Sequence, residues 1–153
     1  MSERGYTITR SFDVPREVIW EAWTTPEHFA VWFGTDQLEM RDVRFDLREG
    51  GSWSGLMILP DGSQRRWHGV FLELERPSKL VMSITDEDVE TEEFELYTLK
   101  LTGKGPKTEM VLRQSGGHLT DEEYEHAKAG TSSFMDSLQG MLPGLLKARH
   151  DAL

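Results

Sequence analysis

The sequence predicts a single α+β domain in which a curved, seven-stranded antiparallel sheet wraps around a long C-terminal helix, in the order β-α-α-β6-α. Three observations support this prediction. Between Gln37 and Ser115 the apolar side chains alternate with polar ones, as in strands with one buried face. From Tyr124 to Leu145 they recur instead at three- and four-residue steps, as in a core-facing helix. The chain of 153 residues has the usual size of one domain, so residues 1–153 are expected to form one unit.

The N-terminal part of the chain is predicted to form one strand followed by two short helices. Tyr6–Phe12 alternates, as a half-buried strand does. Each helix begins next to a proline, whose restricted φ angle suits the first turn of a helix. The first helix is expected over Arg16–Trp23 with Asp13 or Val14 as its N-cap, and the second from Pro26.

Six further strands are expected to follow as an antiparallel meander, because only short connections separate them. Val43, Phe45 and Leu47 share one face of the first of these strands, and two glycines follow at positions 50 and 51. Glycine adopts positive φ angles at little cost, so this pair predicts a tight turn. The remaining strands are, in order, one that carries Trp53 and Met57, and then Arg65–Leu74, Leu80–Thr85, Phe94–Leu101 and Thr108–Ser115.

One long helix is predicted to end the domain. Thr120 and Glu123 have the spacing of a capping box, and Gly140 with Pro143 is expected to kink or end the helix near Leu142. The apolar stripe of this helix is the only element large enough to cover the apolar face of the sheet. Because the sheet is twisted around one helix, we expect space for a ligand between the two.

Composition excludes several classes of function. The formal net charge of −10 disfavours nucleic-acid binding, which needs a basic surface. No apolar run approaches the roughly 20 residues of a membrane helix, and without cysteine the chain has neither disulfides nor thiolate catalysis nor cysteine-ligated zinc. A cytoplasmic protein without a cofactor is therefore expected. The acidic stretch at residues 86–93 is interpreted as a solvated loop, with a docking site for a basic partner as the alternative.

Five sequence blocks carry a resemblance to a known family, and together they span about residues 5–146. The blocks are Phe12–Trp23, Thr25–Glu27 with Trp32-Phe33, Leu47–Trp53, Gly69–Leu74 with Pro77–Leu80, and Thr108–Gln114. In this order they resemble the START-like (SRPBCC) superfamily, and within it the branch named after the C-terminal domain of the heat-shock protein 90 ATPase activator.

This resemblance implies the helix-grip fold, the same architecture that the patterning predicts. It implies less about activity, since relatives include lipid carriers, aromatase/cyclases and hormone receptors. Members of the branch often carry Gly-Trp in the C-terminal helix, whereas here Gly130 is followed by Thr131. Phe134, one turn later, is expected to fill part of the volume of the missing tryptophan.

Strand parity and the helical stripe predict which side chains line the ligand pocket. On Arg65–Leu74 the expected core positions are Val70, Leu72 and Leu74, which places His68 on the same, concave face. The predicted function is the binding of a small hydrophobic or aromatic molecule between the sheet and the C-terminal helix. The predicted lining residues are Trp53, Met57, His68, Tyr97, Met110, Leu112, Gln114, Phe134, Met135 and Leu138.

Two other functions are kept as alternatives. The first is an enzyme of the aromatase/cyclase or hydrolase type, in which His68 acts together with Tyr97 or a pocket carboxylate. The second is a stress-related partner of a chaperone, which the name of the branch suggests.

Two surface features complete the sequence predictions. His118, Glu122 and His126 have four-residue spacing, but because His118 precedes the helix cap they are interpreted as exposed residues and no metal site is predicted. Trp67 has the parity opposite to His68 and is expected to be an exposed or edge aromatic residue. Such a residue favours a homodimer formed through that patch or through a sheet edge.

Overall fold

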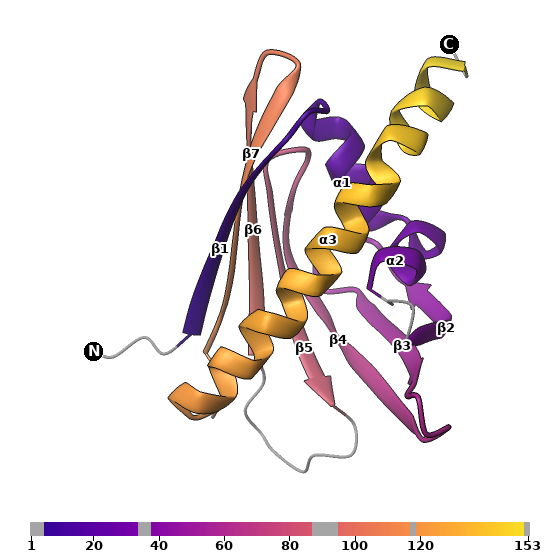
Figure 1. The fold of residues 1–153 in the computed structure, drawn as a ribbon, viewed down its shortest axis with the longest axis vertical. Coiled ribbons are helices and arrows are strands. Elements are labelled where there is room, and N and C mark those ends of the chain that lie inside the picture. Colours follow the sequence, from indigo (N-terminus) through magenta and orange to yellow (C-terminus); the bar gives the residue numbers. More distant parts are fainter. Residues whose placement is uncertain (1–4, 34–37, 87–94, 117–118, 152–153) are drawn as a thin grey trace.

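The computed structural model describes residues 5–33, 38–86, 95–116 and 119–151 (Figure 1). The elements follow the predicted order, β-α-α-β6-α. They are β1 (Gly5–Phe12), α1 (Arg16–Thr24), α2 (Pro26–Trp32), β2 (Glu39–Phe45), β3 (Ser52–Ile58), β4 (Gln64–Glu75), β5 (Lys79–Asp86), β6 (Glu95–Lys104), β7 (Lys107–Ser115) and α3 (Asp121–Asp151).

The seven strands form one antiparallel sheet in the order β1-β7-β6-β5-β4-β3-β2. β1 therefore pairs with the last strand rather than with the next strand in sequence, and β1 and β2 form the two edges of the sheet. α3 crosses one face of the sheet diagonally, with its N-terminal half beside β1 and its C-terminal half beside α1 and α2 (Figure 1). The predicted helix-grip architecture is confirmed.

The hydrophobic core lies between the sheet, α3 and the helix pair. Aromatic side chains dominate the part of the core near α2, where Phe29 contacts Trp32, Phe33, Phe45 and Trp53 with ring centroids 4.7–5.6 Å apart. Burial of side chains this large supplies most of the hydrophobic stabilisation of a domain. The largest fully buried side chains are Trp23, Trp32, Trp53, Phe29, Phe71, Ile19, Leu80, Met82, Leu99, Met110, Leu112 and Met135.

The helix starts differ in how they are capped. At α3 the predicted capping box is confirmed: Glu123 N–H donates to Thr120 Oγ1 over 3.2 Å, and Thr120 N–H donates to Glu123 Oε1 over 3.0 Å. At α1 the prediction was wrong, because Pro15 itself occupies the N-cap position and no side chain caps the helix. Pro15 has an extended backbone with ψ of 152°, as the residue before a helix often has.

α3 does not end near Leu142, which was one of the two outcomes that the sequence predicted there. It continues through Gly140 and Pro143 to Asp151. Both interrupting residues face solvent, whereas Leu142 is buried, so core packing keeps the helix in place despite the missing proline N–H. Arg149 in the last turn donates to Glu21 of α1 over 2.5 Å, which fixes the end of the helix to its neighbour.

An irregularity in β2 changes the predicted face of that strand. The register with β3 shifts between Arg41 and Arg44, and Asp42 within the shift has a φ of +51°. Phe45 packs against the core as expected, but the strand ends there. Leu47, which was predicted to share this face, lies beyond the strand and is 47% exposed.

β4 carries the largest correction to the predicted parity. Leu74 packs against the core as expected, but the register with β5 shifts between Phe71 and Glu73, which reverses the alternation. Phe71 is consequently fully buried, whereas Leu72 is 44% exposed and His68 is exposed. Counting back from Leu74 across this irregularity placed His68 on the wrong face of the sheet.

The same reversal moves Trp67 to the inner face, where its side chain is partly buried and packs against the core. The prediction of an exposed aromatic residue was therefore wrong. Next to it, Gly69 lies directly beneath Trp53: an added Cβ would be 2.6 Å from Trp53 Nε1 and 1.9 Å from the carbonyl oxygen of Ser83. Only glycine lets Trp53 lie this close to the sheet.

Candidate functional site

Five polar side chains lie buried in the otherwise apolar interface between α3 and the sheet. They come from four elements that are distant in sequence, and each occupies an inward position of its strand or helix. Their exposed fractions are 4–9%. Because a buried polar group is costly unless it is hydrogen-bonded, such a cluster requires internal partners. The members are Tyr6 of β1, Glu95 and Tyr97 of β6, Gln114 of β7 and Thr131 of α3.

These side chains form one hydrogen-bonded chain, which we call the polar chain. The Tyr6 hydroxyl donates to Gln114 Oε1 over 2.5 Å and lies 2.6 Å from Thr131 Oγ1. Gln114 Nε2 in turn donates to Glu95 Oε1 over 3.2 Å, and Tyr97 OH lies 3.3 Å from Thr131 Oγ1. The polar chain thus connects the helix to three neighbouring strands of the sheet.

The direction of the donors follows from counting protons. The Tyr6 hydroxyl has one proton, which it donates to Gln114, so Thr131 must donate to Tyr6. The single proton of Thr131 is then used as well, and Tyr97 must donate to Thr131. Every donor therefore points away from Tyr97 and toward the carboxylate of Glu95.

Both tyrosines of the polar chain are held in the neutral form. Burial raises the pKa of Tyr6 far above the usual value, and the neighbouring Tyr97 and the Glu95 carboxylate add to the effect. Burial also raises the pKa of Tyr97, again with a contribution from Glu95. The two hydroxyl groups consequently remain available as hydrogen-bond donors and acceptors at neutral and moderately alkaline pH.

A pocket of about 330 Å³ lies where β1 and α3 begin, next to the polar chain. The aromatic part of its wall is formed by Tyr6 and Tyr124, whose rings meet edge to face with centroids 6.5 Å apart. Tyr6 belongs to both the pocket and the polar chain, so the pocket wall is directly hydrogen-bonded to the interior. The lining residues are Gly5, Tyr6, Asp121, Tyr124, Glu125 and Lys128.

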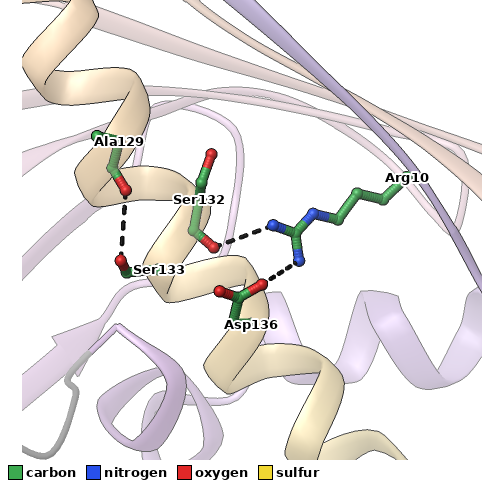
Figure 2. Close-up of polar contacts among 5 residues, drawn as sticks. All are labelled: Arg10, Ala129, Ser132, Ser133 and Asp136. Atoms are coloured by element: carbon green, nitrogen blue, oxygen red, sulfur yellow. Dashed lines mark hydrogen bonds and ion pairs between the residues drawn. The ribbon is translucent and has the colours of Figure 1, made fainter.

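Arg10 holds the edge strand against the helix further along β1 (Figure 2). Its guanidinium donates to Asp136 Oδ1 over 2.8 Å and to the backbone carbonyl oxygen of Ser132 over 3.1 Å. The side chain of Asp136 is 72% exposed, whereas that of Arg10 is 23% exposed. β1 and α3 are thus joined inside by Tyr6 and Thr131 and at the surface by Arg10.

The predicted pocket residues divide into two groups in the structure. Phe134 is partly buried and stacks on Phe33 with ring centroids 4.7 Å apart, and His68 lies on the opposite face of the sheet from the core. His68 therefore does not line the interface with α3, and the role of the other nine predicted residues in ligand binding stays a prediction. The others, apart from Phe134, are buried on the inner side: Trp53, Met57, Tyr97, Met110, Leu112, Gln114, Met135 and Leu138.

Three members of the polar chain were missed in the sequence. Tyr6 has the inward parity of the first strand, and Glu95 has the same parity as Tyr97, so alternation alone could have found both. Thr131 has an inward position on the stripe of the C-terminal helix and departs from the tryptophan of relatives, but neither observation predicts its hydrogen bonds. Its hydroxyl is the hydrogen-bonding link between the helix and the two tyrosines.

The described parts of the chain contain neither a metal-binding cluster nor a helix that could span a membrane. No group of three or more histidine, aspartate or glutamate side chains there is arranged to hold a metal ion; His118 lies outside these parts, and Glu122 and His126 are exposed. In the same residues, no helix is long and apolar enough to cross a membrane.

Comparison with known proteins gives one family match. The family model described as Activator of Hsp90 ATPase homolog 1-like protein matches residues 13–143. A search of curated proteins finds no match to this sequence.

Many solved structures share the fold. A protein from Chromobacterium violaceum has a TM-score of 0.81 at 17% sequence identity, covering 90% of this chain and 96% of its own. A protein from Nitrosomonas europaea has a TM-score of 0.76 at 22% identity, covering 96% of both chains. An Hsp90 activator from Plasmodium falciparum has a TM-score of 0.70 at 22% identity, covering 91% of this chain and 96% of its own. At these identities the likeness shows the fold alone.

Proposed function

Because the chain belongs to the family of Activator of Hsp90 ATPase homolog 1-like proteins, we propose that it binds a small hydrophobic or aromatic molecule between the sheet and α3. The observation that carries this proposal is the polar chain, which lies buried in an apolar, aromatic-rich interface and is hydrogen-bonded to a pocket wall. Ligand sites of this kind are largely apolar and contain a few polar groups that fix the orientation of the bound molecule.

The proposal assigns different tasks to the two kinds of side chain. Apolar residues such as Met110, Met135 and Leu138 would supply the contact surface, since methionine in particular adapts its shape to a ligand. Tyr97 and Thr131 would supply polar contacts. The Tyr97 hydroxyl donates its proton to Thr131 and keeps lone pairs that accept a hydrogen bond from a ligand.

An enzymatic role based on His68 loses its structural support. His68 is exposed on β4, on the face opposite to the buried Phe71, so it does not reach the interface with α3. We expect His68→Ala to leave ligand binding unchanged. A loss of binding in this variant would contradict the assignment of the site to the inner face.

Native mass spectrometry of the protein purified from its source tests the proposed function. We expect the native mass to exceed that of the 153-residue chain, and this excess to disappear on denaturation. We also expect a small apolar compound in the organic extract. Thr131→Trp, which restores the tryptophan common in relatives, would fill part of the interface and is expected to reduce the bound fraction. A chain that carries no compound, and whose tryptophan fluorescence no apolar probe changes, would contradict the proposal.

Association with a chaperone of the Hsp90 class is a second candidate, which rests on the description of the matching family. Its test is co-purification of the native chain with the Hsp90 of its source, followed by the ATPase rate of that Hsp90 with and without the chain. An unchanged rate and no co-purification would dispose of this candidate.

A cytoplasmic location and a homodimer stay proposals. The homodimer can no longer be based on Trp67, which packs against the core, and depends on the free edges of β1 and β2 alone. Analytical ultracentrifugation at micromolar concentration distinguishes monomer from dimer.

A further inference from the structure

The buried tryptophans differ in whether their indole N–H has a partner. Trp32 Nε1 donates to the backbone carbonyl oxygen of Ala22 over 2.7 Å, and Trp53 Nε1 donates to that of Ser83 over 2.8 Å. Both bonds connect one element of the fold to another. The indole N–H groups of these two tryptophans are therefore explained by a structural role.

Trp23 has no such partner. Its side chain is only 1% exposed, and its Nε1 has no hydrogen-bond acceptor in the described parts of the chain. Trp67 Nε1 on β4 is also buried without an acceptor there, but no ring contact in those parts links Trp67 to the polar chain. Native proteins satisfy the great majority of buried donors, because an unmade bond costs about 1–3 kcal/mol.

The position of Trp23 connects its donor with the candidate site. Trp23 belongs to α1, and its ring meets the ring of Tyr97 edge to face with centroids 6.4 Å apart. Tyr97 is the first donor of the polar chain, hydrogen-bonded to Thr131 of α3. Trp23 also packs against Trp32, with ring centroids 4.6 Å apart. Its ring is therefore held in place, while its N–H makes no hydrogen bond within the described residues.

We propose that the N–H of Trp23 donates a hydrogen bond to an acceptor atom of the bound molecule, and that Trp23 thereby determines ligand specificity. This inference rests on the proposed function and specifies the chemical class of the ligand. An indole N–H is a donor only, so the ligand must present an acceptor at this point.

The charge around Trp23 narrows the chemical class of the ligand further. An anionic acceptor would be buried in an apolar interface close to the polar chain, which ends on the carboxylate of Glu95, in a protein of net charge −10. A neutral oxygen avoids this repulsion. The structure therefore favours a neutral, largely apolar molecule with a carbonyl or ether oxygen, such as an aromatic ketone.

A matched pair of probes tests this inference. 1-Indanone and indane share one ring skeleton and differ by a ketone oxygen, so the ratio of their dissociation constants isolates the contribution of the acceptor. We expect Trp23→Phe, which keeps a ring and removes the N–H, to weaken binding of 1-indanone about tenfold and to leave indane within about twofold. Trp32→Phe is the control, since its N–H already bonds to Ala22.

The outcomes separate this inference from the proposed function. If both probes bind but Trp23→Phe changes their affinities equally, the inference is wrong and the proposed function stands. If neither probe binds the wild-type chain, the inference is contradicted, and the proposed function is decided by its own test, the compound retained in native mass spectrometry. A selective loss of 1-indanone binding that occurs equally in Trp32→Phe would also overturn the inference.

The indole N–H resonances provide a measurement that does not depend on a variant binding well. The five tryptophans give five indole cross-peaks in a ¹H–¹⁵N spectrum, which single Trp→Phe variants assign. We expect the Trp23 proton to shift downfield on addition of 1-indanone, while those of Trp32 and Trp53 stay in place. A Trp23 resonance that does not move when 1-indanone binds would contradict the proposed hydrogen bond.

Discussion

The hydroxyl of Thr131 on α3 lies 2.6 Å from the hydroxyl of Tyr6 on the edge strand β1. This contact joins two residues 125 positions apart, and Tyr6 in turn bonds to Gln114 on the neighbouring strand. The long helix is therefore attached to the sheet by a specific polar link as well as by apolar packing. Such links determine one arrangement of helix and sheet where apolar contact alone would allow several.

Thr131→Val is expected to lower the free energy of unfolding by about 1–3 kcal/mol, because it leaves the buried Tyr6 and Tyr97 hydroxyls without the partner they share. Urea unfolding followed by tryptophan fluorescence measures the change. Ser133→Ala, on an exposed position of the same helix, is the control and is expected to stay within about 0.5 kcal/mol of the wild type. Equal stability of the two variants would show that the hydroxyl of Thr131 contributes nothing.

Gly69→Ala is expected to destabilise the protein by more than about 3 kcal/mol, since the added Cβ would overlap the backbone of β5 and the ring of Trp53. Gly130→Ala is the matched control, because an added Cβ there meets nothing within 4 Å. In a helix interior this control should stabilise the protein by up to about 1 kcal/mol. Thermal unfolding of both variants checks the pair, and an ordinary melting temperature for Gly69→Ala would mean that Trp53 does not lie against the sheet as described.

The stability of the protein is expected to fall above about pH 10, where tyrosines of the unfolded chain ionise. The folded pKa values of Tyr6 and Tyr97 are raised, so the folded state retains protons that the unfolded state releases. Their contribution is complete below pH 10 and is lost as the pH rises toward the folded pKa values, by at most about 1.4 kcal/mol per pH unit for each group.

Urea unfolding between pH 8 and pH 11 measures this dependence. Tyr6→Phe is expected to reduce the slope above pH 10, because one of the two groups no longer titrates. If Tyr6→Phe and the wild type lost stability in parallel, Tyr6 would have an ordinary pKa in the folded protein.

Asp136→Asn is expected to cost less than about 1 kcal/mol, because the ion pair with Arg10 is largely exposed on the side of Asp136. Arg10→Met removes both the ion pair and the bond to the Ser132 carbonyl, and should cost more than Asp136→Asn. Measuring both variants at low and high salt separates the ion pair from the hydrogen bond. High salt should abolish the cost of Asp136→Asn but only reduce that of Arg10→Met, because salt screens the ion pair and leaves the bond to the Ser132 carbonyl. Equal costs for the two variants would assign the whole contribution to the ion pair.

Local patterns in the sequence determined the order of the elements, the short turns and the capping box at Thr120. Each of these depends on residues close together in the chain, whose backbone preferences act before any packing occurs. Parity also identified the inward positions of β6 and β7, including Tyr97 and Gln114, because those strands pair without a register shift. On these elements the alternation of apolar and polar residues translates directly into faces.

Only the tertiary structure decided the face of His68, the continuation of α3 past Pro143 and the partners of Thr131. The register shift after Phe71 depends on how β4 pairs with β5, which no pattern within β4 reveals. Packing of Leu142 outweighs the backbone preference of the proline beside it. The polar chain exists because β1 pairs with β7 and α3 crosses beside β1, which brings Tyr6, Gln114 and Thr131 together from both ends of the sequence.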